Sequence, residues 1–430
     1  MAVPVKATIF AYQVGFGDCF LLRFDYDDQS RRHMLVDFGT TGLPENVAGE
    51  HMLQVARDIE SKCTERAGDR LDIVVATHRH ADHISGFATK DGAGSGDVIR
   101  ALKPSVVLQP WTEAPEAPVD WKGPEGSDPI AAFAARRSSL ENMHAMAAQA
   151  VAFVDANDTK LPQGVASQLR FIGEDNIANK SAIDNLQTMS DRRLYLFHGC
   201  TLDLSEFLPD IQVDVLGPPT LEQTESIRKQ KSSDKDEFWQ FAPRRFSDAT
   251  ALDRSKLLFP DAERVLRSGL FTEQRWLARR LDETNADMML GLVRSLDAQM
   301  NNTSLILLLR AGTKTLLFPG DAQLENWQYA LQSNLAPLLD DVDLYKVGHH
   351  GSRNATPRSM WNRFKKKSRQ DTPERITSVV STKHGKHGSV DKHTEVPRGT
   401  LVAELDTYSN FHSTEQLGEG VLYDMIEVAL

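Results

Sequence analysis

The strongest constraint on this chain is a cluster of histidines placed directly after an apolar strand. Residues 71–76 form a short, almost entirely apolar run, which is typical of a strand buried on both faces. The run is followed at once by Thr77-His78-Arg79-His80-Ala81-Asp82-His83. Imidazole nitrogens and a carboxylate oxygen on such a rigid support are ligands that divalent transition metals bind. The pattern predicts a metal site at a strand end. The alternative is a solvated polar turn, in which this spacing of histidines and aspartate would have arisen by chance.

Composition excludes several classes of protein. The chain has 430 residues, of which 40% are hydrophobic and 25% are charged, so it is neither disordered, collagenous nor a coiled coil. The sequence has neither a run of about 18 apolar residues nor a recognisable secretory leader, so we expect a cytoplasmic protein without a membrane part. A net charge of -11 argues against a protein that coats nucleic acid through its overall charge, but leaves room for a local basic patch. The 3 cysteines form no C-x-x-C pair, which argues against a disulfide framework.

Apolar runs and turn signals predict a mixed α/β layered architecture with two β-rich halves. Strands are expected at residues 7–14, 19–26, 34–38, 71–76, 105–109, 194–197, 213–216, 304–309, 315–318, 343–347 and 377–381, with a helix at 50–62. Two zones depart from this pattern, at approximately 111–193 and 220–301. The first combines a proline-rich loop with an alanine-rich helical stretch, and the second is charged and helical. We expect one domain over residues 1–430 that carries two mainly helical insertions.

Two later strand ends also carry residues that bind metals. One apolar strand is followed by Pro-Gly-Asp321, and another by Gly-His349-His350-Gly-Ser. A Gly-Asp step alone is usually a turn, whereas His-His-Gly-Ser after a strand is more specific. His78 and His80 could bind one ion, and the neighbouring Asp82 and His83 a second, which would require a bridging ligand from these later motifs.

These motifs resemble those of the metallo-β-lactamase fold superfamily, and most closely the branch that includes the nuclease domain of the ComEC competence protein. The similarity runs through residues 14–19, 35–39, 77–83, 215–218, 302–321, 345–352 and 379–382. It thus extends over nearly the whole chain apart from the two insertions. The resemblance implies a four-layer αββα sandwich with metals at the rim between the sheets, and a hydrolase.

The resemblance also implies roles for individual residues. His78 and His80 would hold one metal, Asp82 and His83 the other, Asp321 would bridge them, and His349 or His350 would complete the second site. We favour His350 as the ligand and His349 as the residue facing the substrate. Many superfamily members add a histidine to the first metal, for which this chain offers His144 or His198, neither in the usual context. The ComEC-like branch commonly lacks this ligand.

Further positions are less specific. The family pattern places Asp37 beneath the metals, where it would orient ligand imidazoles; Asp18 is either a similar residue or a turn residue. Relatives open the last helix with a His-Pro step near the substrate, and His393 is the nearest match, although the proline is displaced to Pro397. We interpret His384 and His387 as residues of a solvated loop.

A basic segment follows the His-His motif. Residues 353–369 contain no acid and seven cations, namely Arg353, Arg358, Arg363, Lys365, Lys366, Lys367 and Arg369. Thr356 and Pro357 form a good N-terminus for a helix. The segment is either a solvated helix face or a rim that attracts phosphate groups.

The leading hypothesis is a dinuclear phosphodiesterase or nuclease that uses a metal-bound hydroxide, with DNA or RNA among the candidate substrates. Two Zn²⁺ ions, or alternatively Mn²⁺, suit the mixed ligands. The candidate catalytic residues are Asp82, His349 and, as a second choice, His393. One alternative is a hydrolase of a non-nucleic ester, lactone or thioester. Another is an effector module with a structural metal site, whose insertions contact a protein partner.

Overall fold

The computed structural model describes residues 2–47, 49–114, 123–124, 126–128, 180–224, 301–352, 356–387 and 395–430. Contacts within the chain define two compact units. The first combines Met1–Leu140, Ala178–Glu222 and Ala298–Leu430, and the second combines Glu141–Ile177 and Gln223–Asp297. Nearly all described residues belong to the first unit. Most of each predicted insertion lies outside the described residues, and the single domain over 1–430 stays a prediction.

The first sheet has seven strands in the order β13-β1-β2-β3-β4-β5-β6. Its strands are β1 (Pro4–Tyr12), β2 (Cys19–Tyr26), β3 (Arg31–Phe38), β4 (Ile73–Val75), β5 (Val106–Pro110), β6 (Arg193–Leu196) and β13 (Tyr423–Ala429). The strands from β13 to β3 pair antiparallel, and those from β3 to β6 pair parallel. The first and last strands of the chain are therefore neighbours.

The second sheet has six strands in the order β12-β11-β10-β9-β8-β7. Its strands are β7 (Ile211–Gly217), β8 (Ile306–Ala311), β9 (Lys314–Phe318), β10 (Leu344–Lys346), β11 (Thr377–Val380) and β12 (Asn410–Ser413). Strands β7 to β9 form an antiparallel meander, and β9 to β12 pair parallel. The mixed α/β class expected from the sequence is confirmed.

One core lies between the two sheets, and two further cores lie on their other faces. On β2, Phe20, Leu22 and Phe24 join residues of the second sheet in the shared core, while Cys19 and Leu21 contact helices. This alternation follows from the two-residue repeat of a strand. Because both faces of each sheet are covered, the strands read as nearly continuous apolar runs, which is why the sequence predicts most of them.

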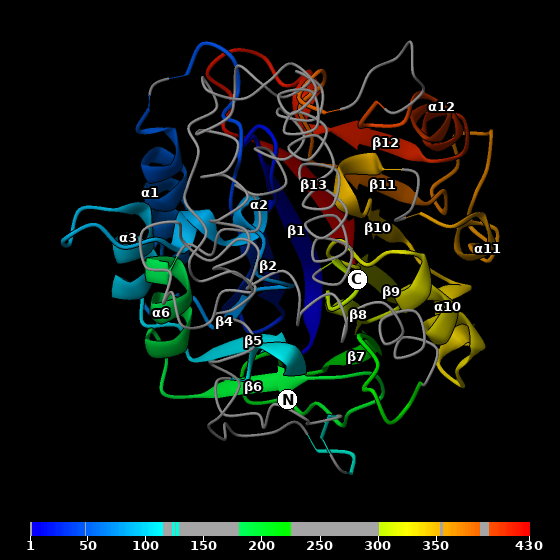
Figure 1. Ribbon diagram of the computed structural model, residues 1–430, viewed down its shortest axis with the longest axis horizontal. Coiled ribbons are helices and arrows are strands. Elements are labelled where there is room, and N and C mark those ends of the chain that lie inside the picture. The colour runs from blue at the N-terminus through cyan, green and yellow to red at the C-terminus, as the bar shows by residue number, and fades with distance from the viewer. Residues whose placement is uncertain are drawn as a thin grey trace, which may run out of the picture. The chain divides into compact units, whose positions relative to one another are not determined.

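Helices cover the outer face of each sheet (Figure 1). Helices α1 (His51–Cys63), α3 (Ser95–Ala101) and α6 (Lys180–Thr188) pack against the first sheet. Helices α10 (Leu324–Gln332), α11 (Arg358–Trp361) and α12 (Gly399–Tyr408) pack against the second. Shorter elements complete the described chain: α2 (Ala81–Ile84), η1 (Ser85–Phe87), η2 (Trp111–Glu113), η5 (Ala336–Leu339), η6 (His349–Gly351) and η7 (Thr414–Gln416). In the described part of the chain, no helix combines the length and apolar character needed to cross a membrane.

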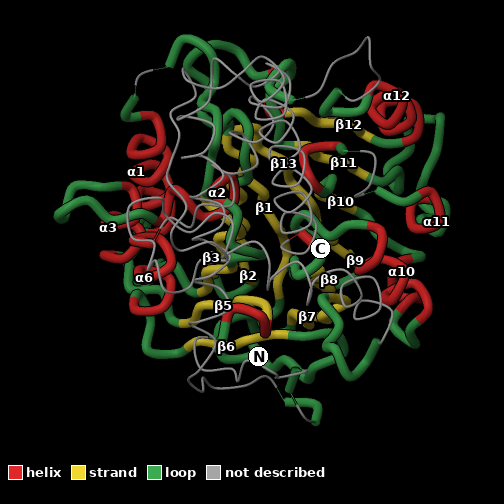
Figure 2. Tube along the Cα trace, in the orientation of Figure 1, coloured by secondary structure: helices red, strands yellow, loops and turns green. Residues whose placement is uncertain are grey.

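The parallel strands place the motif residues at one edge of the two sheets. In the first sheet, Asp37 lies near the end of β3, and β4 is followed by the loop that starts at Thr77. In the second sheet, β9 and β10 are followed by the loops that carry Asp321 and His350. The loops that follow parallel strands leave a sheet at the same edge. Strands and loops can be followed separately in Figure 2. The two sheets face each other across the shared core, so loops from both can meet at this edge.

Candidate metal centre

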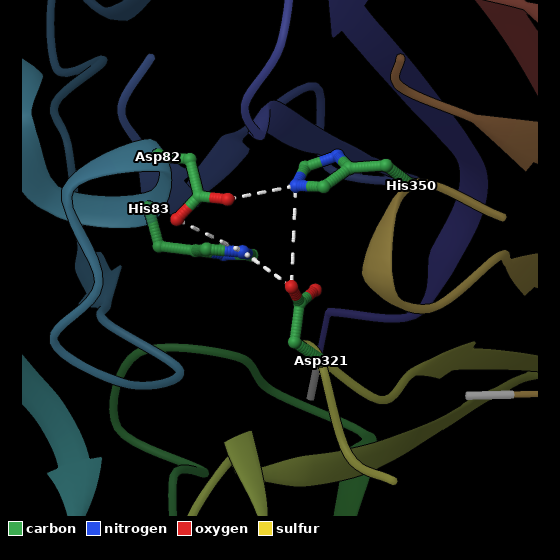
Figure 3. Close-up of side chains that lie close together, drawn as sticks. All are labelled: Asp82, His83, Asp321 and His350. Carbon is green, nitrogen blue, oxygen red and sulfur yellow. Dashed lines mark hydrogen bonds and ion pairs between the residues drawn. The ribbon is translucent and has the colours of Figure 1, made fainter. Parts of the chain in front are cut away.

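Four buried side chains from both sheets converge on one point. They are Asp82, His83, Asp321 and His350, here called the four-residue cluster, and their ligand atoms all lie within 4.8 Å of one another. His350 Nε2 lies 2.9 Å from Asp82 Oδ2, and His83 Nε2 lies 3.1 Å from Asp321 Oδ2. Figure 3 shows the side chains pointing toward a common centre. The structure thus brings together residues that are far apart in the sequence.

A second group lies directly beside the first. His78, His80 and Asp82, here called the three-residue cluster, are all buried. His78 Nε2 lies 2.9 Å from His80 Nδ1, and the rings of His78 and His83 have centroids 4.2 Å apart. Asp82 belongs to both clusters, whereas the motifs predict Asp321 as the bridge. All the residues predicted to bind metal thus gather at one place, and the bridging role of Asp321 stays a prediction.

The donor atoms of the four-residue cluster fit a divalent cation. Asp82 Oδ1 is buried and has no hydrogen-bond partner among the residues that the structure describes, while the buried His83 Nε2 and Asp321 Oδ2 lie 3.1 Å from each other. A buried polar atom without a partner costs roughly 1–3 kcal/mol, and more when it is charged. A cation among these atoms would satisfy them together. Imidazole and carboxylate donors suit Zn²⁺ and Mn²⁺.

The charges of the cluster depend on one another. Burial opposes ionisation of Asp321, but the neighbouring His83, with His349 and His350, lowers the pKa of its carboxyl group well below the usual value. Burial likewise disfavours a charged His83, but Asp321, Asp37 and Asp82 raise the pKa of its imidazole. Burial, together with His83 and His80, lowers the pKa of His78, so this imidazole is neutral. A neutral imidazole is the form that binds metal.

Asp37 fixes the orientation of His83. Its Oδ1 accepts a hydrogen bond from the backbone N–H of Thr77 at 2.7 Å, and its Oδ2 accepts one from the Thr77 hydroxyl at 2.7 Å. His83 Nδ1 lies 2.7 Å from the same Oδ2. In the neutral form of His83, donation of the Nδ1 proton to Asp37 leaves the Nε2 lone pair facing the cluster, where a cation could bind it; outer carboxylates orient ligand histidines in this way. Asp37 thus contacts a histidine of the four-residue cluster, and its place beneath bound metals stays a prediction.

Asp18 lies close to His83, from the first sheet, and to His350, from the second sheet. Its backbone N–H donates to the carbonyl oxygen of Asp82 at 2.9 Å. Its carboxylate lies 3.6 Å from His83 Nδ1 and 3.7 Å from His350 Nδ1, and forms an ion pair with the ammonium group of Lys346. Asp18 is therefore more than a turn residue. Sequence reasoning missed Lys346, although a lysine within an otherwise apolar strand is a signal that could have identified it.

The two adjacent histidines of η6 have different surroundings. His350 is fully buried, with Nδ1 2.9 Å from the carbonyl oxygen of Ser381 and Nε2 facing Asp82. The side chain of His349 is 27% exposed, its Nε2 lies 3.9 Å from Asp321 Oδ2, and its Nδ1 lies 3.1 Å from the Ser352 hydroxyl. Both histidines have positive φ values, 45° and 51°. Such a backbone costs of order 1–3 kcal/mol per residue and is often found at functional sites, although this chain also has it elsewhere, as at Gln29 and Lys103.

The remaining candidate histidines that the structure describes belong to neither cluster. His198 is buried, lies 2.7 Å from the carbonyl oxygen of Leu216 through Nδ1, and belongs to no candidate metal group among the described residues. His144 and His393 lie outside the described residues. His384 is exposed. His387 is instead partly buried, and its ring centroid lies 4.2 Å from that of Phe16, which is also 4.2 Å from His350. The solvated-loop interpretation therefore does not hold for His387.

Arg79 turns away from the two histidines that flank it. Its guanidinium group forms a buried ion pair with Glu113 of η2, with Nε 2.9 Å from each carboxylate oxygen. The pair anchors the His78-Arg79-His80 loop to the end of β5. The sequence gives no hint of this contact, because Glu113 lies 34 positions away.

The basic segment is compensated by acids from the preceding loop. Arg363 and Lys365 pair with Asp340 at 2.7 and 3.1 Å, and Lys366 pairs with Asp343 at 2.8 Å. The helix predicted after Pro357 is the short α11, in which Met360 and Trp361 are buried. The ion pairs weaken the interpretation of the segment as a phosphate-attracting rim.

Comparison with known proteins adds no family. No model of a protein family matches the chain, and no curated protein matches its sequence. The superfamily resemblance therefore rests on the motifs alone.

Proposed function

We propose that this chain is a metal-dependent hydrolase of the metallo-β-lactamase fold that acts on phosphodiesters with two divalent ions, Zn²⁺ or Mn²⁺. The supporting observation is the meeting of buried imidazole and carboxylate donors from both sheets in two clusters that share Asp82. Two facing sheets with helices on their outer faces are compatible with the αββα sandwich of this superfamily. The cytoplasmic location stays a prediction.

Each cluster would hold one ion. When bound, such ions lower the pKa of a coordinated water toward about 7 and offset the negative charge that develops on a phosphoryl group. Asp37 holds the His83 ring through Nδ1, and the carbonyl oxygen of Ser381 holds His350 in the same way. Both rings therefore keep Nε2 directed at the cluster. Burial of these donors keeps bulk water away from them, which strengthens every electrostatic interaction in the centre.

His349 is the residue best placed to meet a substrate. It is the partly exposed member of the group, and Ser352 fixes its ring through Nδ1. Its Nε2 can then donate a hydrogen bond to a phosphoryl oxygen or a proton to the leaving oxygen. A role for His393 stays a prediction, because this residue lies outside the described part of the chain.

A second candidate function is hydrolysis of a non-nucleic ester, lactone or thioester. The observation that favours it is the ion pairing of Arg363, Lys365 and Lys366 with Asp340 and Asp343. A nucleic acid would have to compete with these carboxylates for the cations. The effector-module alternative depends on the insertions, and most of their residues lie outside the described ranges.

The test is metal content by elemental analysis, paired with turnover of bis-p-nitrophenyl phosphate, an oligonucleotide, a lactone and a thioester in Mn²⁺ or Zn²⁺. We expect two ions per chain and phosphodiester cleavage. Replacing His80, Asp82 or His350 with Ala should lower turnover by roughly 10³-fold or more, because the ions generate the nucleophile. Asp321→Asn should reduce metal content, whereas Asp343→Asn, at the other end of the sheet, should not. Cleavage of the lactone or thioester but of no phosphodiester would select the second candidate.

A further inference from the structure

We propose that Lys346 is a positioning residue of the metal centre. Its contacts link the loops of the second sheet, which carry Asp321 and His350, to the loops of the first sheet, which carry Asp82 and His83. The four-residue cluster is thereby assembled before an ion binds. This inference rests on the proposed function only in assuming that the clusters hold metal. It assigns a role to a buried charge that the motifs leave unexplained.

Lys346 lies where an apolar residue is expected. It ends β10, in which Leu344 belongs to the core between the sheets and Tyr345 to the outer core. The two-residue repeat therefore turns Lys346 toward the first sheet. Its side chain is 3% exposed. A buried ammonium group is costly unless it is fully paired, so its partners are informative.

The ammonium group has partners on both sides of the interface. It forms an ion pair with Asp18, in the loop before β2 of the first sheet. It donates to the carbonyl oxygen of Gly320 at 3.3 Å and lies 3.7 Å from Asp321 Oδ1, both in the loop after β9 of the second sheet. A lysine has three N–H donors, and three acceptors surround this one. The contacts thus join the two loops beneath the centre.

Each partner is connected to a member of the four-residue cluster. Asp18 donates its backbone N–H to the carbonyl oxygen of Asp82. Asp321 Oδ1 also accepts the backbone N–H of His349 at 3.0 Å. With Oδ1 held on this side, Oδ2 is the oxygen that faces His83 at 3.1 Å. The charge of Lys346, 3.7 Å from Oδ1, adds to the His349 N–H on that side of the carboxylate and so favours Oδ2 as the oxygen that Asp321 offers to the centre.

Two other roles for this lysine make different predictions. A proton carrier must give up its proton, whereas this ammonium group is held in a buried ion pair with Asp18 and lies 3.7 Å from Asp321 Oδ1. A charge that merely repels cations would weaken metal binding, so its removal would tighten binding. A positioning residue gives the opposite sign, because its removal loosens the site that it assembles.

The experiment compares Lys346→Met with Lys314→Met as a matched control. Lys314 also pairs with an aspartate, Asp343, but at the opposite end of the sheet. Zinc content is measured by elemental analysis, zinc affinity by competition with a chelator, and Mn²⁺ loading by electron paramagnetic resonance, where two neighbouring ions give a spin-coupled signal. We expect Lys314→Met to match the parent chain. Lys346→Met should keep one ion, lose the coupled signal, and bind the second ion about 10- to 100-fold more weakly.

Several outcomes would overturn the proposal. Two ions bound by Lys346→Met with equal or higher affinity would make the lysine a bystander or a repelling charge. Loss of both ions would indicate a general structural role. Lys346→Met leaves Asp18 unpaired and could fail to fold for that reason. In that case the double variant Lys346→Met/Asp18→Asn removes both charges, and its ion content tests the proposal instead. We expect one ion in the double variant; two ions, or failure of the double variant to fold, would overturn the proposal.

The outcome also separates this inference from the proposed function. If the parent chain binds two ions but cleaves no phosphodiester, and Lys346→Met binds one, the proposed function fails and the role of Lys346 stands. If the parent chain cleaves phosphodiesters and Lys346→Met binds both ions normally, the inference alone fails.

Discussion

In several side chains of the candidate centre, one polar atom is held by a neighbouring residue and only the other polar atom faces the clusters. Asp37 contacts Nδ1 of His83, and the carbonyl oxygen of Ser381 contacts Nδ1 of His350, so that in each ring Nε2 faces the clusters. Asp321 follows the same rule with its two oxygens. Because this selection is made by neighbours distant in sequence, the chain order alone reveals the ligand types but not the atom that each offers.

His33 gives a prediction about pH at this scale. It is fully buried on β3, and its Nδ1 lies 3.0 Å from the carbonyl oxygen of Arg70, while Nε2 has no hydrogen-bond partner among the described residues. Burial lowers the pKa of His33 from 6.5 to about 4, although the hydrogen bond to Arg70 opposes the shift. Between these values the unfolded chain binds the proton and the folded chain does not. His33 therefore stabilises the fold above pH 6.5, and this contribution is lost as pH falls toward 4.

We expect the free energy of unfolding to fall by about 2–3 kcal/mol from this residue between pH 7.5 and 4.5. The measurement is urea unfolding at several pH values for the parent chain and for His33→Asn, whose amide can still donate to Arg70 but does not titrate. The difference between the two chains should shrink as pH falls. His384→Asn, at an exposed position, serves as the control and should leave the pH profile unchanged. A constant difference between the parent chain and His33→Asn would contradict the expectation.

At the residue scale, the sequence predicts a functional site where the residues of that site are close together in the sequence. His78, His80, Asp82 and His83 are adjacent, so their pattern predicts a metal site without any fold. Lys346 and its partner Asp18 are far apart in the sequence, and nothing in either neighbourhood indicates that the two charges meet. Buried pairs of this kind depend on which sheets face each other, which the sequence alone does not establish.

At the scale of elements, long apolar strands are the features that the sequence predicts best. Strands β2 and β8 lie within two residues of their expected ranges because both faces are buried. The sequence reasoning missed β12 and β13. In β13, buried and exposed residues are mixed, and only Ile426 is fully buried, so the apolar signal is weak. Element α6 lies within the range predicted as an insertion, yet it packs against the first sheet.

The basic segment after β10 gives a prediction at the element scale. Three of its cations, Arg363, Lys365 and Lys366, are already paired with Asp340 or Asp343. Replacing Lys365 and Lys366 with Glu should therefore change the salt dependence of oligonucleotide binding by less than about one unit of slope per residue. The measurement is the oligonucleotide Kd across a series of salt concentrations. Asp340→Asn is the opposite change: it frees Arg363 and Lys365, and should tighten binding if the segment meets nucleic acid at all. A slope flattened by one unit per lysine would restore the phosphate-rim interpretation.

At the scale of the whole first unit, the proposed metal centre would also link the two sheets. The four-residue cluster takes its candidate ligands from both sheets, so an ion bound there would favour the state in which the two sheets are packed together. An ion present at 100 times its Kd stabilises the folded state by about 2.7 kcal/mol. The stabilising effect requires the complete cluster and not merely the presence of metal in solution.

Removal of metal should therefore lower the melting temperature. We expect a chelator to reduce the Tm of the parent chain by a few degrees, with full recovery when Zn²⁺ or Mn²⁺ is restored. In Asp321→Asn the same treatment should have a much smaller effect, because the second-sheet ligand is impaired. Differential scanning calorimetry with and without chelator provides the measurement. An equal shift in both chains would mean that the ions act elsewhere.

The pairing of β1 with β13 has a consequence for the timing of synthesis. Lys6 and Glu427, which form an ion pair across these strands at 2.7 Å, are 421 positions apart. A ribosome adds roughly 5–20 residues per second, so roughly 20–80 seconds pass between the synthesis of Lys6 and that of Glu427. During this interval the outer edge of β1 has no strand beside it and is open to pairing with other nascent chains. The charge of Lys6 on that edge is the kind of feature that discourages such pairing until the final strand arrives.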